Sequence, residues 1–188
     1  HGSRHKLSEM LGCECVLVRT LRNALASRMP VVLVVSDELL GAVSGLLPAR
    51  DMVVVDAHSR LNWGMGDSIA SGVAHQSSAP GWLVLPGDMP FIRSSTLCAV
   101  AGALDQQPIA YAQHRGRRGH PVGFGAELFS ELVTLTGDAG ARRLLARYPT
   151  AAVELDDARG QGTDELAVMA DENQCARVVL QRQVQRLD

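Results

Sequence analysis

The chain has 188 residues, 46% of them hydrophobic, and a formal net charge of -2 at pH 7. This length is enough to bury one core and too short for two comfortable domains, so residues 1–188 are expected to form a single domain. The near balance of charge argues against a nucleic-acid partner. No apolar run approaches the roughly 20 residues that span a bilayer, and the start of the chain lacks the apolar core of a signal peptide, so we expect no membrane association and a cytoplasmic protein.

The four cysteines give no sign of a metal or redox site. They are Cys13, Cys15, Cys98 and Cys175, and Cys13-x-Cys15 has no second pair or nearby histidines. We therefore expect reduced, mostly buried thiols.

Taken in chain order, the hydrophobic pattern predicts strands that are separated by helices. The predicted strands are residues 31–35, 52–55, 82–85, 109–112, 122–124 and 151–155. The predicted helices are residues 16–26 and 37–47, a segment ending at His75, residues 96–104 capped by Ser94 or Ser95, residues 127–135 and 139–148, and a C-terminal region that Thr163 caps and that includes about 171–188. This alternation predicts an α/β fold with a mostly parallel, doubly wound sheet.

The most informative stretch ends the predicted strand at residues 82–85. Pro86 and Gly87 stop the apolar run, and Asp88 supplies one carboxylate at what would be the carboxyl end of that strand. Ligands of open α/β sheets bind at this end, and carboxylate oxygen suits Mg²⁺, which in turn bridges substrate phosphates. The alternative is an aspartate that only accepts hydrogen bonds from the backbone of its own turn.

Two further loops follow predicted strands and are expected at the same edge of the sheet. Residues 64–68 offer exposed backbone amides and a hydroxyl at a helix start, which favours an anion or a nucleobase edge, with plain helix capping as the alternative. Residues 116–121 combine two glycines, arginines suited to anions, and His120, which Pro121 fixes in an extended conformation. The alternative for this second loop is a solvated hairpin tip.

Five motifs in this order carry a resemblance to a known family. They are Gly2-Ser3-Arg4 with Lys6-Leu7, Gly64-Met65 with Ser68-Ile69, Leu85-Pro86-Gly87-Asp88-Met89-Pro90, Gly119-His120-Pro121-Val122 and Leu135-Thr136-Gly137-Asp138-x-Gly140-Ala141-Arg142. Together they resemble the molybdenum cofactor cytidylyltransferase family within the MobA-like nucleotidyltransferases. The resemblance extends to about Ala170, and it implies a Rossmann-like sheet with helices on both faces.

The resemblance also implies an activity and a set of site residues. The family joins the CMP of CTP to molybdopterin with release of pyrophosphate, uses Mg²⁺, and matures the cofactor for molybdenum hydroxylases of the xanthine dehydrogenase type. By that resemblance, Asp88 is the metal ligand and acts in catalysis with Arg4 and Lys6. The nucleotide-binding residues are Gly2, Ser3, Arg4, Gly64, Ser68 and Gly87, and the residues on the pterin side are Arg118, Gly119, His120 and Pro121.

The chemistry of nucleotidyl transfer fits these residue types. Attack on the α-phosphorus is in line, so catalysis consists mainly of positioning and of neutralising charge on the phosphates. The nucleophile is a phosphate oxygen already on the pterin, and no Ser/His/Asp or Cys/His arrangement is therefore required.

Three features depart from the family pattern. No strand ending in Ala-Ala-Gly precedes Gly2, so the central first strand is missing, and we expect a truncated chain whose opened sheet is marginally stable or associates. Only His5 separates Arg4 from Lys6, a shorter spacing than the family's. Residues 160–164 replace the Asp-Ile-Asp-Thr-Pro motif of the family, which leaves Asp156, Asp157 or Asp164 as candidates for the second metal carboxylate.

These departures keep a second hypothesis open. The chain is then a degenerate or divergent MobA-like homologue of the guanylyl or sugar-nucleotide type, which binds nucleotide, pterin or a partner enzyme without this turnover. The sequence does not decide between CTP and GTP.

Overall fold

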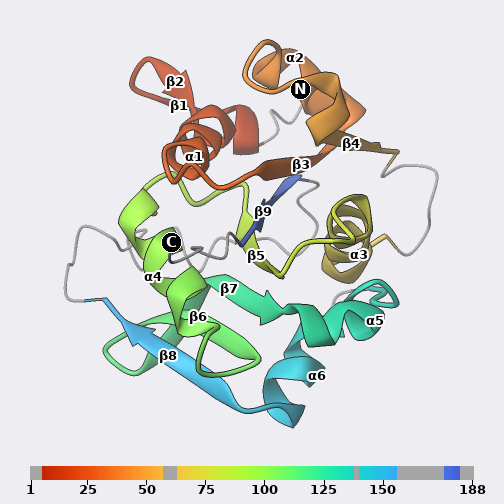
Figure 1. Ribbon diagram of the computed structural model, residues 1–188. Helices are drawn as coiled ribbons and strands as arrows, with labels where there is room; N and C mark the ends of the chain where they lie inside the picture. Colours follow the sequence, from red (N-terminus) through yellow and green to blue (C-terminus); the bar gives the residue numbers. More distant parts are fainter. Residues whose placement is uncertain (1–5, 57–62, 138–139, 156–175, 183–188) are drawn as a thin grey trace, which may run out of the picture.

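The computed structural model describes residues 6–56, 63–137, 140–155 and 176–182 (Figure 1). A seven-stranded sheet has the order β4-β3-β9-β5-β7-β6-β8, and a separate two-stranded ribbon pairs β1 with β2. The strands are β1 Met10–Leu11, β2 Glu14–Cys15, β3 Val31–Ser36, β4 Met52–Val55, β5 Gly81–Pro86, β6 Ile109–His114, β7 Arg117–Gly125, β8 Thr150–Glu154 and β9 Ala176–Gln181. The longer helices are α1 Val16–Leu25, α3 Met65–His75, α4 Ser94–Ala103 and α6 Gly140–Arg147.

The sheet is mixed, but most of its strands point the same way. β3 and β4 are parallel, as are β6 and β8, whereas β9 runs antiparallel to β3 and β5, and β7 runs antiparallel to β5 and β6. Hence β3, β4, β5, β6 and β8 share one direction, and their carboxyl ends meet along one side, which we call the carboxyl edge. The predicted α/β sheet flanked by helices is confirmed.

Helices cover both faces of the sheet, one core on each side (Figure 1). The first core joins α1 and α4 to the sheet through buried residues such as Leu21, Leu97 and Leu83. The second core places α3 and the short helix α5, Phe129–Leu132, over Trp82 and Phe124. Alternate residues of each central strand therefore enter opposite cores, which explains the unbroken apolar runs of the sequence.

The C-terminal helix predicted for about 171–188 is wrong where the structure describes it, because residues 176–181 form strand β9. Val178 and Leu180 enter the first core, whereas Val179 enters the second. This alternation gives Val178, Val179 and Leu180 an apolar environment on both faces of the sheet, which a one-sided helix would not. The cap predicted at Thr163 lies outside the described residues.

β9 occupies an interior position of the sheet, between β3 and β5. Val178 is opposite Leu33 on one side and opposite Leu85 on the other. Both neighbouring strands therefore have a hydrogen-bonded partner, and the opened sheet expected from the missing first strand is wrong for this fold. The expected marginal stability rested on those unpaired backbone groups and loses its basis.

Several local predictions also need correction. The helix predicted over 37–47 is a 3₁₀ turn, Asp37–Leu39, followed by the single turn α2, Leu40–Val43, because the chain leaves the helix at Ser44. The helix predicted over 127–135 is similarly short, with a 3₁₀ turn at Ala126–Leu128 before α5. Neither predicted serine caps α4, since that helix starts at Ser94 after Arg93, without a side-chain cap bond.

The described cysteines differ from the prediction in their exposure. Cys13, Cys15 and Cys98 are free thiols, but Cys13 and Cys98 are exposed, so the prediction of mostly buried thiols is wrong for the described cysteines. Within the described parts of the chain, no helix combines the length and the apolar character needed to cross a membrane.

Close packing of α3 on β9 gives a first testable prediction. A Cβ on Gly72 would lie 2.5 Å from Cγ2 of Val179 and 3.1 Å from Cγ2 of Val34, so Gly72→Ala should overpack this contact and destabilise the protein by about 1–3 kcal/mol. Thermal or denaturant unfolding measures this loss. The double variant with Val179→Ala should lose less stability than the two single variants lose together, because the smaller alanine side chain removes the clash. Strictly additive losses would mean that α3 does not pack on β9.

Candidate functional site at the carboxyl edge

Asp88 lies in a turn immediately after the central strand β5. β5 ends at Pro86, Gly87 is buried, and Asp88 is half-buried at the carboxyl edge. The turn is held from α1, because the side-chain amide of Asn23 donates a 2.8 Å hydrogen bond to the carbonyl of Pro90. The structure thus places the predicted metal ligand where the sequence predicted, on a turn fixed by a helix from elsewhere in the chain.

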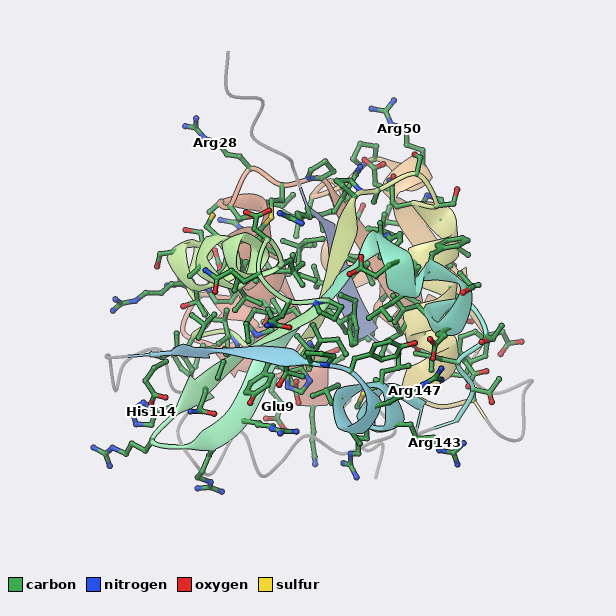
Figure 2. All side chains as sticks on the ribbon, turned by 60° about the horizontal axis from the view of Figure 1, so that its bottom comes forward. Glu9, Arg28, Arg50, His114, Arg143 and Arg147 are labelled. Carbon is green, nitrogen blue, oxygen red and sulfur yellow. The ribbon has the colours of Figure 1, made fainter. Side chains whose placement is uncertain are left out.

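Lys6 precedes Glu9, a residue that lies at the end of the molecule where β6 ends (Figure 2). It begins the 3₁₀ turn Lys6–Ser8, which leads into Glu9, and Leu7 anchors this turn in the first core with 1% of its surface exposed. Figure 2 shows Glu9 and His114, the last residue of β6, at one end of the molecule and Arg28 and Arg50 at the opposite end. Gly2, Ser3 and Arg4, the other predicted phosphate-loop residues, lie outside the described residues.

The prediction of exposed amides at residues 64–68 is wrong for Gly64 and Gly66, because their N–H groups are bonded within the chain. The N–H of Gly64 donates to Oδ2 of Asp67 at 2.9 Å, and the N–H of Gly66 donates to the carbonyl of Gly137 at 2.7 Å. The hydroxyl of Ser68 accepts a 3.1 Å hydrogen bond from Nε1 of Trp63, and Ser68 is 3% exposed. The described contacts are those of helix capping, and a direct nucleotide contact of Gly64 or Ser68 stays a prediction.

The predicted loop at residues 116–121 is mostly strand. The turn between β6 and β7 is only Arg115-Gly116, both with positive φ, 48° and 78°. Two consecutive positive values are typical of a two-residue hairpin turn. Beyond this turn, Arg117, Arg118 and Gly119 are exposed at the start of β7, so the solvated hairpin tip describes this segment best.

The direction of β7 places His120 at the carboxyl edge. β7 runs antiparallel to β5, and Val122 is opposite Val84 in the last pair of their register, so His120, which precedes Val122 in β7, lies on the side of the sheet where β5 ends. His120 is half-buried and precedes Pro121 through a cis peptide bond. The structure therefore brings the predicted pterin-side and metal-side residues to adjacent strands at one edge.

Contacts with β8 hold this hairpin in place. Glu154 accepts hydrogen bonds from the backbone N–H of Arg115 at 2.7 Å and from the side chain of Gln113 at 2.9 Å. Nδ1 of His114 lies 2.9 Å from the carbonyl of Leu155, which requires the proton on Nδ1. The guanidinium of Arg118 stacks 5.0 Å from the ring centroid of Tyr111, which restrains one of the predicted anion-binding arginines.

The donor set at the carboxyl edge fits a magnesium ion that is shared with phosphates. Among the described residues, no three His, Cys, Asp or Glu side chains converge into a metal cluster. Mg²⁺ commonly uses one or two carboxylates, substrate phosphates and water, so Asp88 alone is compatible with such a site. Asp156, Asp157 and Asp164, the candidates for a second carboxylate, lie outside the described residues.

Sequence reasoning missed three polar groups at or near this edge. Ser36 ends β3 with 4% of its surface exposed, and its hydroxyl has no hydrogen-bond partner within the described chain. Trp63 and Asp67 hold the start of α3 through the bonds given above. Trp63 directly precedes the Gly64-Met65 motif, so its position in the sequence could have identified it. The role of Asp67 depends on a contact with Gly137, which no local sequence pattern indicates.

A separate cavity of about 240 Å³ lies between α5 and α6. Its lining residues are Glu131, Thr134, Leu135, Thr136, Arg143, Leu144 and Arg147. Arg147 contacts Glu131 at 3.0 Å, and a hydrogen bond from the Tyr148 hydroxyl to Glu131 raises the pKa of Tyr148 above its usual value of 10.0. None of the predicted site residues lines this cavity.

A sheet with helices on both faces and polar turns at the carboxyl ends of its strands is the arrangement of Rossmann-like nucleotide-binding proteins. The model of the MobA-like NTP transferase domain matches residues 1–153, and the chain belongs to this family. The resemblance found in the sequence motifs is thereby confirmed.

Individual relatives agree with this assignment. The chain is 30% identical over 167 residues, 85% of this chain and 81% of the relative, to the purine catabolism protein PucB of Bacillus subtilis (strain 168). The structure of Rv0371C in complex with manganese from Mycobacterium tuberculosis H37Rv superposes with a TM-score of 0.68 at 24% identity, covering 84% of this chain and 85% of that one. A nucleotidyl transferase from Methanothermobacter thermautotroptrophicus, Mth528, gives 0.65 at 21% identity, covering 87% and 82%, and these two share the fold.

Proposed function

We propose that this protein transfers CMP from CTP to molybdopterin and releases pyrophosphate, with a divalent cation bound at Asp88. The observation that carries the proposal is the carboxyl edge itself. There the Asp88 turn, fixed by Asn23, follows β5, and the neighbouring antiparallel strand β7 carries His120 near its start, on the same side of the sheet. Membership of the MobA-like NTP transferase family supports nucleotidyl transfer as the reaction class.

The cation is proposed as Mg²⁺, held by the carboxylate of Asp88 and by nucleotide phosphates. When bound, it would supply positive charge that stabilises the charge developing on the transferred and leaving phosphates. The manganese complex of the structural relative Rv0371C supports a divalent ion in this fold. The protein's own part is to hold one carboxylate rigidly, which the Asn23–Pro90 hydrogen bond provides.

The remaining residues are proposed to position the two substrates. Lys6, with Gly2, Ser3 and Arg4, would neutralise the triphosphate, and buried Gly87 leaves the β5 turn without a side chain that could obstruct it. On the acceptor side, exposed Arg118 and Gly119 and half-buried His120 would contact the pterin phosphate, for which arginine is well suited. Pro121 then fixes His120 at the end of β5.

The relative PucB supports a particular class of partner enzyme. PucB is a purine catabolism protein, and xanthine is a purine, which supports a molybdenum hydroxylase of the xanthine dehydrogenase type as the recipient of the cofactor. The alternative is a divergent homologue that binds CTP, GTP or pterin without turnover. This alternative is supported by the start of α3, where the N–H groups of Gly64 and Gly66 donate hydrogen bonds within the chain and not to a ligand.

Pyrophosphate release under defined substrates distinguishes these functions. The protein is incubated with molybdopterin, with Mg²⁺ or Mn²⁺, and with CTP, GTP, ATP or UTP in parallel. The proposal predicts pyrophosphate release that requires metal and pterin and is greatest with CTP. Pyrophosphate release with GTP and with none of the other three nucleotides would make GTP the substrate in place of CTP. Nucleotide binding without pyrophosphate release in any combination would favour the alternative.

The proposed contact of His120 with molybdopterin, and not with CTP, gives a second testable prediction. His120→Ala should raise the KM for molybdopterin by about tenfold, the size expected for one lost hydrogen bond to a charged group, and leave the KM for CTP unchanged. Steady-state kinetics with each substrate varied in turn measure both values. Weaker CTP binding with unchanged pterin binding would reverse the proposed roles.

A further inference from the structure

Asp67 joins two segments that lie 70 positions apart in the sequence. Its Oδ2 accepts one hydrogen bond from the N–H of Gly64 and another from the N–H of Gly137, each 2.9 Å long. Gly137 in turn accepts a 2.7 Å hydrogen bond from the N–H of Gly66 through its carbonyl. The first turn of α3 is therefore bonded to the turn that precedes α6, in both directions.

The fit between these two turns is close enough to require glycine on both sides. A Cβ on Gly66 would lie 2.7 Å from the carbonyl oxygen of Gly137, nearer than real Cβ contacts allow. Gly137 has a φ of 61°, in the left-handed region that favours glycine. The carboxylate of Asp67 also lies in the first turn of α3, where the helix dipole stabilises a negative charge.

We propose that Asp67 is a positioning residue for nucleotide binding. Its carboxylate holds the turn at Thr136–Gly137 against residues 64–68, so that both segments are in place before the nucleotide arrives. This inference rests on the proposed function and also on the prediction from the family resemblance that Gly64 and Ser68 belong to the nucleotide pocket. Preorganisation of this kind lowers the entropic cost of binding, so it acts on nucleotide affinity and not on the chemical step.

Removing the carboxylate should separate KM from kcat. Asp67→Ala leaves the amides of Gly64 and Gly137 without their acceptor, and we expect the KM for CTP to rise about tenfold or more while kcat stays within about threefold of the wild type. Asp67→Asn keeps an amide oxygen that accepts both bonds and should restore most of the affinity. Asp51→Ala is the matched control, since it removes a carboxylate at the start of β4, the opposite edge of the sheet.

The outcomes separate this inference from the proposed function. Wild-type protein that binds and turns over no nucleotide would overturn both. Wild-type turnover with an unchanged KM in Asp67→Ala would overturn only the role of Asp67, as would an Asp67→Asn variant as impaired as Asp67→Ala. Amide hydrogen exchange at Gly137 provides a readout without substrate: its N–H should be protected in the wild type and exchange faster in Asp67→Ala.

Discussion

Asp88→Ala is expected to reduce metal-dependent nucleotidyl transfer by at least about 10³-fold, because a metal ion contributes several kcal/mol of charge stabilisation in the transition state. The fold should persist, since Asp88 lies half-buried in a turn after β5 and contributes no apolar side chain to either core. The measurement is pyrophosphate release with CTP and molybdopterin at saturating Mg²⁺. Thermal unfolding of the same sample reports on the fold.

Asp51→Ala serves as the control for this experiment. Asp51 lies 4.0 Å from Arg50, whose side chain is 84% exposed, so the loss of this pair should change stability by less than about 1 kcal/mol and leave activity unchanged. Full turnover in Asp88→Ala would remove the metal role from this residue. A large fall in its unfolding temperature would instead make Asp88 a structural residue of the turn.

Val178→Asp is expected to unfold the protein at room temperature or to bring it close to unfolding. Val178 is fully buried in the first core, opposite Leu33 on β3 and Leu85 on β5. An unpaired carboxylate in that position costs several kcal/mol, which is a large part of the roughly 5–15 kcal/mol that stabilises a typical domain. Denaturant unfolding followed by circular dichroism measures the change.

Gln181→Asp is the matched control within the same strand. Gln181 is half-buried at the end of β9, where a carboxylate reaches solvent, so this variant should lose much less stability than Val178→Asp. Equal and small losses for both variants would show that residues 176–181 do not lie between β3 and β5.

The parts of the fold that depend on local sequence were predictable. The apolar run into Pro86-Gly87 fixes both the strand β5 and its end, and so places Asp88 at the carboxyl edge. The apolar run of β3 was equally clear, because a strand covered on both faces needs an unbroken hydrophobic sequence. The apolar run of β4 was also predicted, although β4 is an edge strand on which Val54 is exposed.

The parts that depend on distant contacts were not predictable from local patterns. Residues 176–181 form a strand because they fill a place between β3 and β5, and no property of the segment alone names those partners. The Arg115-Gly116 turn lacks the Asn-Gly or Asp-Gly signature of a two-residue hairpin, so Arg117 to Pro121 were predicted as a loop.

The same limit applies to the candidate site. Two of the amides predicted to be exposed, those of Gly64 and Gly66, donate to Asp67 and to Gly137, and Gly137 follows α3 by more than sixty residues. Asp88 was predicted correctly on the turn after β5, whereas Gly119, His120 and Pro121, predicted in a loop, belong to strand β7. Their hydrogen-bond partners required the tertiary structure, because capping groups in this protein come from distant segments as well as local ones.

A Mn²⁺ titration followed by electron paramagnetic resonance tests whether Asp88 holds the divalent cation that the nucleotide shares. The titration is run with a non-hydrolysable CTP analogue on wild type, Asp51→Ala and Asp88→Ala. If Asp88 is this ligand, the first two proteins should show nucleotide-dependent Mn²⁺ binding, and the Mn²⁺ affinity of Asp88→Ala should be weakened by more than about tenfold, because a carboxylate ligand is lost. Equal Mn²⁺ affinity in all three would contradict this role of Asp88.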